Sequence, residues 1–383
     1  MARLPATRSV ALMVLMVWLP ACASAQPAPP AASAPLRAPP TRPAAAPAQL
    51  WPVTRLRGTD CVSVRDIAER FGLKAAWSRP ELAMTLSDKS GVRFTFETRQ
   101  RDFYFDGLRI FLGEPPLLEK DTLWLTKLDV IKLIAPLFRP VEHLALLPAA
   151  PRTIVLDPGH GGSDPGKENQ TVGAQEKTLT LDVALRLKKL LEAQGWRVVM
   201  TRTTDTKLAA EQALDLQRRA DVANKAKADL FLSIHFNSVE RDAARVTGVE
   251  TYTMAPQFML STASDQPDEM TRVAFPGNRQ DYANLLLGAE LHRALLAGLK
   301  TPDRGFKRGR LAVLRFIECP GALVECGYLS SNAEARRLVT PEFRQKIAEG
   351  LAAGLQGYAA TLAALQPKPA PSAVTPTPAP TSR

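Results

Sequence analysis

The sequence predicts an α/β fold: a larger C-terminal domain with a mostly parallel or mixed sheet flanked by helices, preceded by a small α+β accessory domain. Hydrophobic residues make up 45% of the 383 residues, which is enough to bury a sizeable core. From 152 to 365, apolar strand-like runs alternate with segments of helical period, as α/β folds require. Between 51 and 147 the runs are shorter and turn signals separate them.

The first 25 residues are typical of a signal peptide. Arg3 and Arg8 give a basic start, Val10 to Leu19 is apolar, and the small residues Ala23-Ser24-Ala25 precede Gln26. Lipidation of Cys22 is an alternative, because Leu19-Pro20-Ala21-Cys22 resembles a bacterial lipobox. On either reading the protein is expected to be exported to the periplasm or cell envelope, and no later segment is apolar enough to span a membrane.

Proline-rich segments are expected to flank the folded part. Eight of the 32 prolines lie in the predicted linker 26–49, and six more lie in the predicted disordered tail, 366–383. Residues 1–49 and 366–383 together carry six basic residues and no acid, so 43 of the 49 basic residues and all 38 acidic residues lie in 50–365. A net charge of +5 there is too small for a nucleic-acid-binding surface, although it suits an anionic polymer.

The three cysteines beyond the leader are expected to be small core residues. Cys61, Cys319 and Cys326 are an odd number, which does not make a disulfide framework in an oxidising compartment. The apolar strand between Cys319 and Cys326 would hold those two apart.

The accessory domain is predicted over residues 51–147. Helical spacing from Val62 to Phe71 stops at Gly72, strand-like runs follow at 82–86, 92–96 and 103–105, and a second helix is expected from Leu125 to Phe138. This pattern resembles the stalk module at the N-terminus of copper amine oxidases and of many bacterial wall proteins. The resemblance implies an accessory or binding role without copper.

The larger domain is predicted over residues 152–365. The expected strands lie at 153–157, 196–200, 230–234, 249–253 and 322–324, and the expected helices at 179–191, 208–227, 285–299 and 341–365. A short linker around 146–151 is expected to join the two domains.

Two of the four histidines lie at the ends of predicted strands. His160 follows the strand at 153–157, and His235 ends the strand at 230–234. Ligands bind at the carboxyl ends of strands in such sheets, and the glycines beside His160 leave access for one. His143 and His292 carry no such signal and are expected to be structural.

Two glutamates complete a candidate zinc site. Glu176 stands at the start of a predicted helix, where the helix dipole favours its ionised form, and it could be the third ligand beside two histidines. Glu325 interrupts the apolar run from Ala322 to Val324, and a buried carboxylate is costly unless it is paired or functional. The alternatives are an ordinary first-turn glutamate for Glu176 and an arginine-paired core residue for Glu325.

Residues 152–360 resemble the zinc-dependent N-acetylmuramoyl-L-alanine amidases that cleave bacterial peptidoglycan. The similar stretches occur in the family's order: 154–162, Glu176-Lys177, 201–205, Arg219 with 223–224, 233–238 and 323–330. The resemblance implies that His160, Glu176 and His235 bind Zn²⁺ and that Glu325 is the catalytic acid/base. It also implies structural ion pairs or hydrogen bonds for Arg202, Asp205 and Arg219.

The activity implied by the resemblance is hydrolysis of the amide bond between the lactyl group of N-acetylmuramic acid and L-alanine. A zinc-activated water would attack this bond, and the reaction would serve cell-wall remodelling or cell separation. The rival hypotheses are a zinc metallopeptidase and a wall-binding protein without catalysis. The expected partners are peptidoglycan and a protein activator.

Some amidases of this family carry an inserted helix that covers the zinc until an activator displaces it. The corresponding stretch here is 254–281, in which Pro256, Pro267 and Pro276 disfavour a long helix. The sequence therefore predicts a flexible, irregular loop near the mouth of the site. Asp265, Asp268 and Glu269 are the acids of this loop that could reach the zinc.

Overall fold

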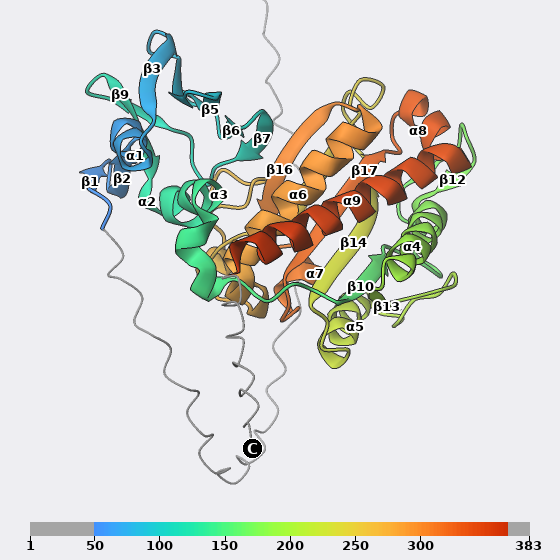
Figure 1. The fold of residues 1–383 in the computed structure, drawn as a ribbon. Coiled ribbons are helices and arrows are strands. Elements are labelled where there is room, and N and C mark those ends of the chain that lie inside the picture. The colour runs from blue at the N-terminus through green and yellow to red at the C-terminus, as the bar shows by residue number, and fades with distance from the viewer. Residues whose placement is uncertain (1–49, 367–383) are drawn as a thin grey trace, which may run out of the picture. The chain divides into compact units, whose positions relative to one another are not determined.

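The computed structural model describes residues 50–366, all of which fall within one compact unit (Figure 1). The predicted leader, linker and all but the first residue of the tail lie outside these residues. In the first part of the chain the strands are β1 (Thr54–Leu56), β2 (Thr59–Ser63), β3 (Lys74–Arg79), β4 (Ala83–Asp88), β5 (Gly91–Glu97), β6 (Asp102–Phe105), β7 (Leu108–Phe111), β8 (Leu117–Glu119) and β9 (Thr122–Thr126). The helices are α1 (Val64–Phe71), α2 (Lys127–Asp129) and α3 (Ala135–Phe138), with a π-helix at Val130–Ile134 and a 3-10 helix at Pro140–Leu146.

The second part of the chain alternates strands and longer helices. Its strands are β10 (Thr153–Pro158), β11 (Glu168–Asn169), β12 (Ala174–Gln175), β13 (Arg197–Met200), β14 (Leu230–Asn237), β15 (Val249–Met254), β16 (Asp303–Gly309) and β17 (Gly321–Tyr328). Its helices are α4 (Glu176–Ala193), α5 (Gln212–Lys225), α6 (Asp281–Leu299), α7 (Ala312–Arg315), α8 (Asn332–Leu338) and α9 (Pro341–Leu365).

One mixed sheet of 11 strands runs through both parts, in the order β13-β10-β14-β17-β15-β16-β7-β6-β5-β4-β3. β13, β10, β14 and β17 are parallel neighbours, and β15 pairs antiparallel to β17. β16 pairs with β7 of the first part through Phe306 and Ile110. The predicted α/β class is confirmed, and the predicted accessory and larger domains share this sheet. The boundary between them, expected around 146–151, stays a prediction.

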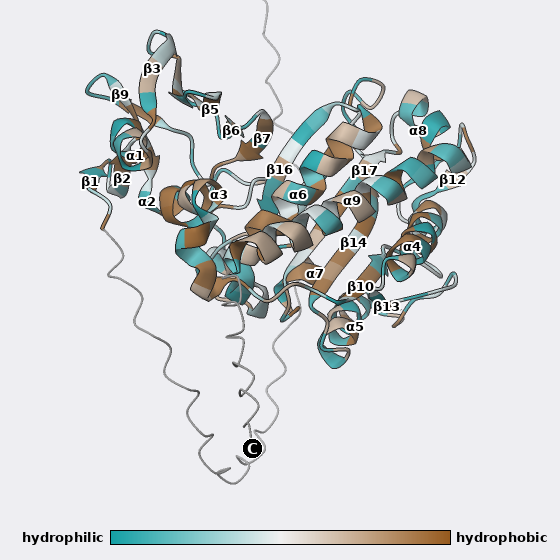
Figure 2. Cartoon of the chain, in the orientation of Figure 1, coloured by the Kyte–Doolittle hydropathy of each residue, from teal (hydrophilic) through white to brown (hydrophobic). Residues whose placement is uncertain are grey.

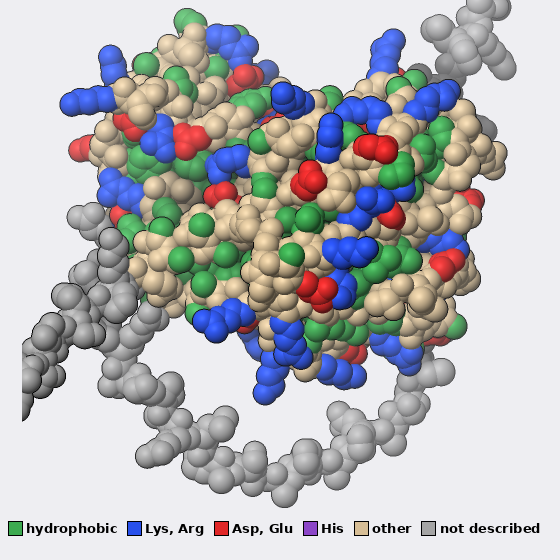
Figure 3. Space-filling view, turned by 45° about the vertical axis from the view of Figure 1, so that its right-hand side comes forward, with side chains coloured by type: hydrophobic (Ala, Val, Ile, Leu, Met, Phe, Trp, Pro, Cys, Tyr) green, Lys and Arg blue, Asp and Glu red, His purple; other side chains and the backbone are tan. Residues whose placement is uncertain are grey.

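Helices cover the two faces of the second part of the sheet. Alternate residues of β10, β14 and β17, such as Ile154, Leu232 and Val324, pack with α4, α6 and α9. The residues between them, such as Val155 and Leu323, pack with α5 and α7 on the other face. Figure 1 shows α6 and α9 lying side by side, and Figure 2 shows that β14, buried between the layers, is hydrophobic along much of its length. On the face drawn in Figure 3, basic and acidic side chains are interspersed.

Most predicted elements form close to where the pattern placed them, but three helices begin later than predicted, among them the helix expected from Val62, which begins at Val64 after β2. The helix predicted at 208–227 begins only at Gln212, because the Asp215 carboxylate accepts hydrogen bonds from the backbone of Leu208 and Ala209 and holds them in a loop. The helix predicted at 125–138 begins at Lys127, because Thr126 ends β9 and caps the turn through its hydroxyl. Gly72 ends α1 as predicted, in the left-handed conformation that glycine tolerates.

The cysteines and two of the histidines have the structural roles predicted for them. Cys61, Cys319 and Cys326 are buried free thiols. His292 is fully buried and bonds to Thr251 and Asp303, while His143 stacks on Tyr282. Within 50–366 no helix has both the length and the hydropathy needed to cross a bilayer.

The segment 254–281 is irregular apart from 3-10 helices at Glu269–Arg272 and Pro276–Gln280, so the absence of a long helix is confirmed. Its predicted position near the mouth of the candidate site is wrong. Because β15 runs antiparallel to β17, the segment leaves the sheet at the edge opposite to the one where β10 and β14 end. There Arg101, before β6, donates hydrogen bonds to its backbone carbonyls, and the Thr262 amide bonds to the Arg308 carbonyl.

Removing the acids of this segment is therefore expected to leave turnover unchanged. Asp265 pairs with Arg101, and Asp268 caps the first 3-10 helix, so the triple alanine variant of Asp265, Asp268 and Glu269 should keep kcat within about twofold of the wild-type value. Steady-state hydrolysis of peptidoglycan, the activity that the family resemblance implies, measures this. A tenfold rise in kcat would show that the segment does restrain the enzyme.

Candidate metal centre

The histidine at the end of β10 is held in a tight, glycine-rich turn. His160 has φ of +62°, an uncommon conformation for a residue with a side chain. A Cβ atom at Gly159 would lie 2.2 Å from the His235 ring, and one at Gly166 would lie 2.6 Å from Glu176 Oε2. These two glycines therefore allow the turn to approach the neighbouring side chains closely.

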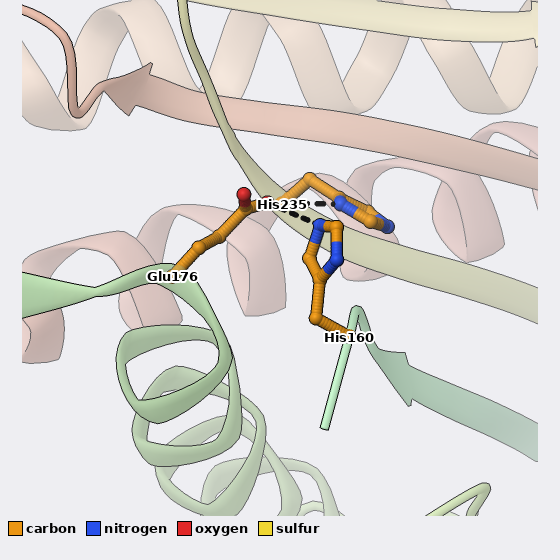
Figure 4. A group of neighbouring side chains, drawn as sticks. All are labelled: His160, Glu176 and His235. Atoms are coloured by element: carbon orange, nitrogen blue, oxygen red, sulfur yellow. Dashed lines mark hydrogen bonds and ion pairs between the residues drawn. The ribbon is translucent and has the colours of Figure 1, made fainter. Parts of the chain in front are cut away.

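Three side chains from different elements point toward one another (Figure 4). His160 follows β10, Glu176 is the first residue of α4, and His235 lies on β14. Glu176 Oε1 lies 3.1 Å from His160 Nε2 and 3.0 Å from His235 Nδ1. One ligand atom from each residue lies within 4.8 Å of the others, so the three predicted ligands form a group that could hold a metal ion.

Backbone and carboxylate groups fix the orientation of this group. Glu176 is buried, and its oxygens accept hydrogen bonds from the amides of Phe236 (3.0 Å) and Lys167 (2.8 Å). Asp164 Oδ2 lies 3.0 Å from His160 Nδ1 and leaves Nε2 free to face the centre. A carboxylate on the outer nitrogen is the usual partner of a metal-ligating histidine. Asp164 was not predicted from the sequence; the signal that could have indicated it is an acid four residues after His160.

The group is electrostatically matched before any metal binds. Burial disfavours the charged forms of Glu176 and His160, but the hydrogen bonds that the two side chains make outweigh the effect of burial. The pKa of Glu176 therefore falls below its ordinary value, and the pKa of His160 rises above its own. Two imidazoles and one ionised carboxylate are the donor set that catalytic zinc sites use. These residues therefore fit the predicted Zn²⁺.

Glu325 lies on β17 directly across from His235 on β14. Its side chain is partly buried, and its Oε2 atom is buried without a hydrogen-bond partner among the described residues. Burial, followed by the nearby Glu176 and Glu250 carboxylates, raises the pKa of Glu325 well above its ordinary value. The arginine-paired alternative for Glu325 has no support here. A carboxyl group beside the three converging side chains, with one oxygen that has no partner among the described residues, could exchange a proton at this centre.

A buried ion network holds the turn that carries His160. Arg219 on α5 bonds to Asp157 and Asp215 at 2.8 Å each, and its Nη2 donates to the His160 carbonyl at 2.8 Å. Arg202 donates to the carbonyls of Pro158 and Gly159. Asp205 bonds to the Gly162 amide and to Lys177. These contacts agree with the structural roles implied for Arg202, Asp205 and Arg219.

Replacing Arg219 with methionine is expected to lower the free energy of unfolding by about 3–5 kcal/mol, because it leaves the buried Asp157 and Asp215 carboxylates without their cation. Urea unfolding measures this loss. Arg218→Met is the matched control: Arg218 is exposed on the same helix, and its loss should change stability by about 0.5 kcal/mol or less. Equal stability of the two variants would contradict a structural role for Arg219.

Comparison with known proteins identifies the family to which this chain is similar. The family model described as N-acetylmuramoyl-L-alanine amidase matches residues 154–357, more than half of the chain. This chain belongs to the N-acetylmuramoyl-L-alanine amidase family. The match includes all three converging residues and Glu325, and it leaves out the strands before β10.

Several relatives are similar over the same region. The sporulation-specific N-acetylmuramoyl-L-alanine amidase of Bacillus subtilis (strain 168) is 35% identical over 205 residues, which are 53% of this chain and 66% of the relative. AmiC of Neisseria meningitidis serogroup B is 33% identical over 224 residues, covering 54% of this chain and 52% of AmiC. Among solved structures, the CwlV catalytic domain of Bacillus (Paenibacillus) polymyxa var. colistinus has 29% identity and a TM-score of 0.44, covering 54% of this chain and 97% of that domain. The chain spans about half to two thirds of the length of the two sequence relatives described.

Proposed function

We propose that this protein is a zinc-dependent N-acetylmuramoyl-L-alanine amidase that hydrolyses the amide bond between the lactyl group of N-acetylmuramic acid and L-alanine in peptidoglycan. The observation that supports it most is the convergence of His160, Glu176 and His235, with Glu325 on the neighbouring strand, inside the region that matches the amidase family. Both named relatives above are N-acetylmuramoyl-L-alanine amidases.

His160, Glu176 and His235 would hold the zinc. When bound, zinc activates a water molecule and polarises the scissile carbonyl. Asp164 keeps His160 in the tautomer that presents Nε2, and the Phe236 and Lys167 amides keep the Glu176 carboxylate in place.

Glu325 would move the protons. As a carboxylate it would accept a proton from the attacking water, and as a carboxylic acid it would return that proton to the departing L-alanine nitrogen. The products are a glycan strand and a stem peptide with a free amino terminus.

Export to the cell envelope belongs to this proposal, because peptidoglycan lies outside the cytoplasm. Signal-peptide cleavage after Ala25, lipidation of Cys22 and a protein activator stay predictions. The role of residues 51–147 as a stalk-like accessory domain also stays a prediction, since the family match begins at residue 154.

Parallel digestion of purified peptidoglycan and casein tests the proposal. We expect new amino-terminal alanine from peptidoglycan and no cleavage of casein. Cleavage of casein at a comparable rate would favour the metallopeptidase alternative. Zinc binding without hydrolysis of either substrate would favour a wall-binding protein.

A further inference from the structure

Glu250, a buried carboxylate beside Glu325, has no part in the chemistry proposed above. It lies on β15 directly across from Glu325 and is only 2% exposed. A buried carboxylate needs strong compensation, and Glu250 has four donors. They are Lys307 Nζ at 2.7 Å, the Tyr252 hydroxyl at 2.7 Å, the Asn237 side-chain amide at 3.1 Å and the Tyr328 hydroxyl.

These donors tie Glu250 to the strands that carry the candidate catalytic residues. Asn237 stands two residues after His235 on β14, and Tyr328 stands three residues after Glu325 on β17. Glu250 on β15 therefore joins the ends of the strands that present His235 and Glu325. A displacement of its carboxylate would be passed to both.

Lys307 supplies the positive charge of this network. Its ammonium lies 5.5 Å from the centre of the Phe111 ring and 5.7 Å from that of Tyr252, so two aromatic rings bound it. Three carboxylates are neighbours here, those of Glu176, Glu325 and Glu250, and the Lys307 ammonium forms an ion pair with that of Glu250.

Phe111 brings the accessory part of the chain into the network. It is the last residue of β7, which pairs with β16 beside Lys307. Gly305 makes room for the ring, because a Cβ atom there would lie 2.4 Å from Phe111 Cε2. The family match does not include β7, so an amidase domain without this accessory part would lack the ring.

We propose that Lys307 and Glu250 are positioning residues for Glu325 and His235, and that Phe111 of the accessory part completes their arrangement. The inference rests on the proposed function. The accessory part thus contributes to turnover itself, through the chain of contacts from Phe111 through Lys307 and Glu250 to the strand ends.

Variants of the full-length chain, assayed on a soluble N-acetylmuramoyl-L-alanyl peptide, test this. Lys307→Met keeps the length of the side chain and removes its charge, and we expect kcat to fall about 30-fold because small displacements of reacting groups are costly. Phe111→Leu removes only the ring and should lower kcat about fivefold. In both variants KM should stay within about twofold and zinc content should stay at the wild-type level, because the proposal gives neither residue a contact with substrate or metal and neither belongs to the converging group.

The design separates positioning from general destabilisation. Phe111→Tyr keeps the ring and should restore kcat. Tyr104→Leu is the control: Tyr104 is an exposed aromatic residue on β6, two residues after Asp102, which pairs with Phe111. Its replacement should change neither kcat nor the melting temperature. The double variant Phe111→Leu/Lys307→Met should turn over no more slowly than Lys307→Met alone, because the ring acts through the ammonium. The melting temperatures of the zinc-free proteins show whether each variant is folded.

Wild-type kcat in Phe111→Leu and Lys307→Met would overturn the inference. Fully additive losses in the double variant, or a failure of Phe111→Tyr to restore kcat, would overturn it as well. If Lys307→Met does not fold, the comparison of leucine with tyrosine at position 111 decides. An inactive wild-type enzyme would instead contradict the proposed function.

Discussion

Replacing Glu325 with glutamine is expected to lower kcat for peptidoglycan hydrolysis by about 10²–10⁴-fold, the usual contribution of a general acid/base. Glutamine has nearly the same shape but can neither accept the proton of the attacking water nor return it to the leaving nitrogen. Because Glu325 is not one of the three converging residues, the variant should keep one zinc per chain. Glu325→Ala should behave in the same way.

Single-turnover assays together with zinc determination by atomic absorption measure this. Glu318→Gln is the matched control: Glu318 is exposed just before β17, and its replacement should leave kcat unchanged. Wild-type turnover in Glu325→Gln would show that the proton passes through another group. Loss of zinc would show that Glu325 is a ligand.

Replacing His235 with alanine is expected to abolish both zinc binding and turnover. His235 supplies one of three ligand atoms, and its Nδ1 also lies 3.0 Å from Glu176 Oε1. A site reduced to His160 and Glu176 should lose zinc affinity by at least about 100-fold, more than the loss of a hydrogen-bond partner of a ligand usually costs. Competition with a chromogenic chelator measures the affinity directly.

His143→Ala is the control for this experiment, since His143 stacks on Tyr282 and lies outside the converging group. It should bind zinc and turn over at the wild-type rate. Retention of stoichiometric zinc in His235→Ala would contradict the assigned ligand set, and the same applies to Glu176→Ala.

The sequence predicted that His160 and His235 lie at one site because the local patterns around them are strong. The apolar runs before His160 and His235 are fully buried parallel strands, and parallel strands bring their carboxyl ends to one edge. The apolar period predicted the helix that begins near Glu176, but spacing alone favours an ordinary first-turn glutamate there, and the ligand role of Glu176 was implied by the resemblance to the amidase family. The short alternating strands β4, β5 and β6 followed from residues of alternating polarity for the same reason.

Other parts of the site depend on contacts between residues far apart in the sequence. β16 was not predicted, because Asp303-Arg304-Gly305-Phe306-Lys307-Arg308-Gly309 has too many charges to indicate a strand. Two of these charged residues are paired in the fold, because Lys307 forms an ion pair with Glu250 and Asp303 pairs with His292. The predicted position of the segment 254–281 was wrong for a related reason. The antiparallel direction of β15 decides at which edge of the sheet the segment begins, and strand direction cannot be read from a local pattern.

Mass spectrometry of the fragments released from purified peptidoglycan, with and without a chelator, tests the central proposal most directly. We expect intact stem peptides that begin with L-alanine, together with glycan strands whose N-acetylmuramic acid keeps a free lactyl carboxyl group. The chelator should abolish these products, and added zinc should restore them. Cleavage within the stem peptide or the glycan, or the same products in the presence of the chelator, would contradict a zinc-dependent N-acetylmuramoyl-L-alanine amidase.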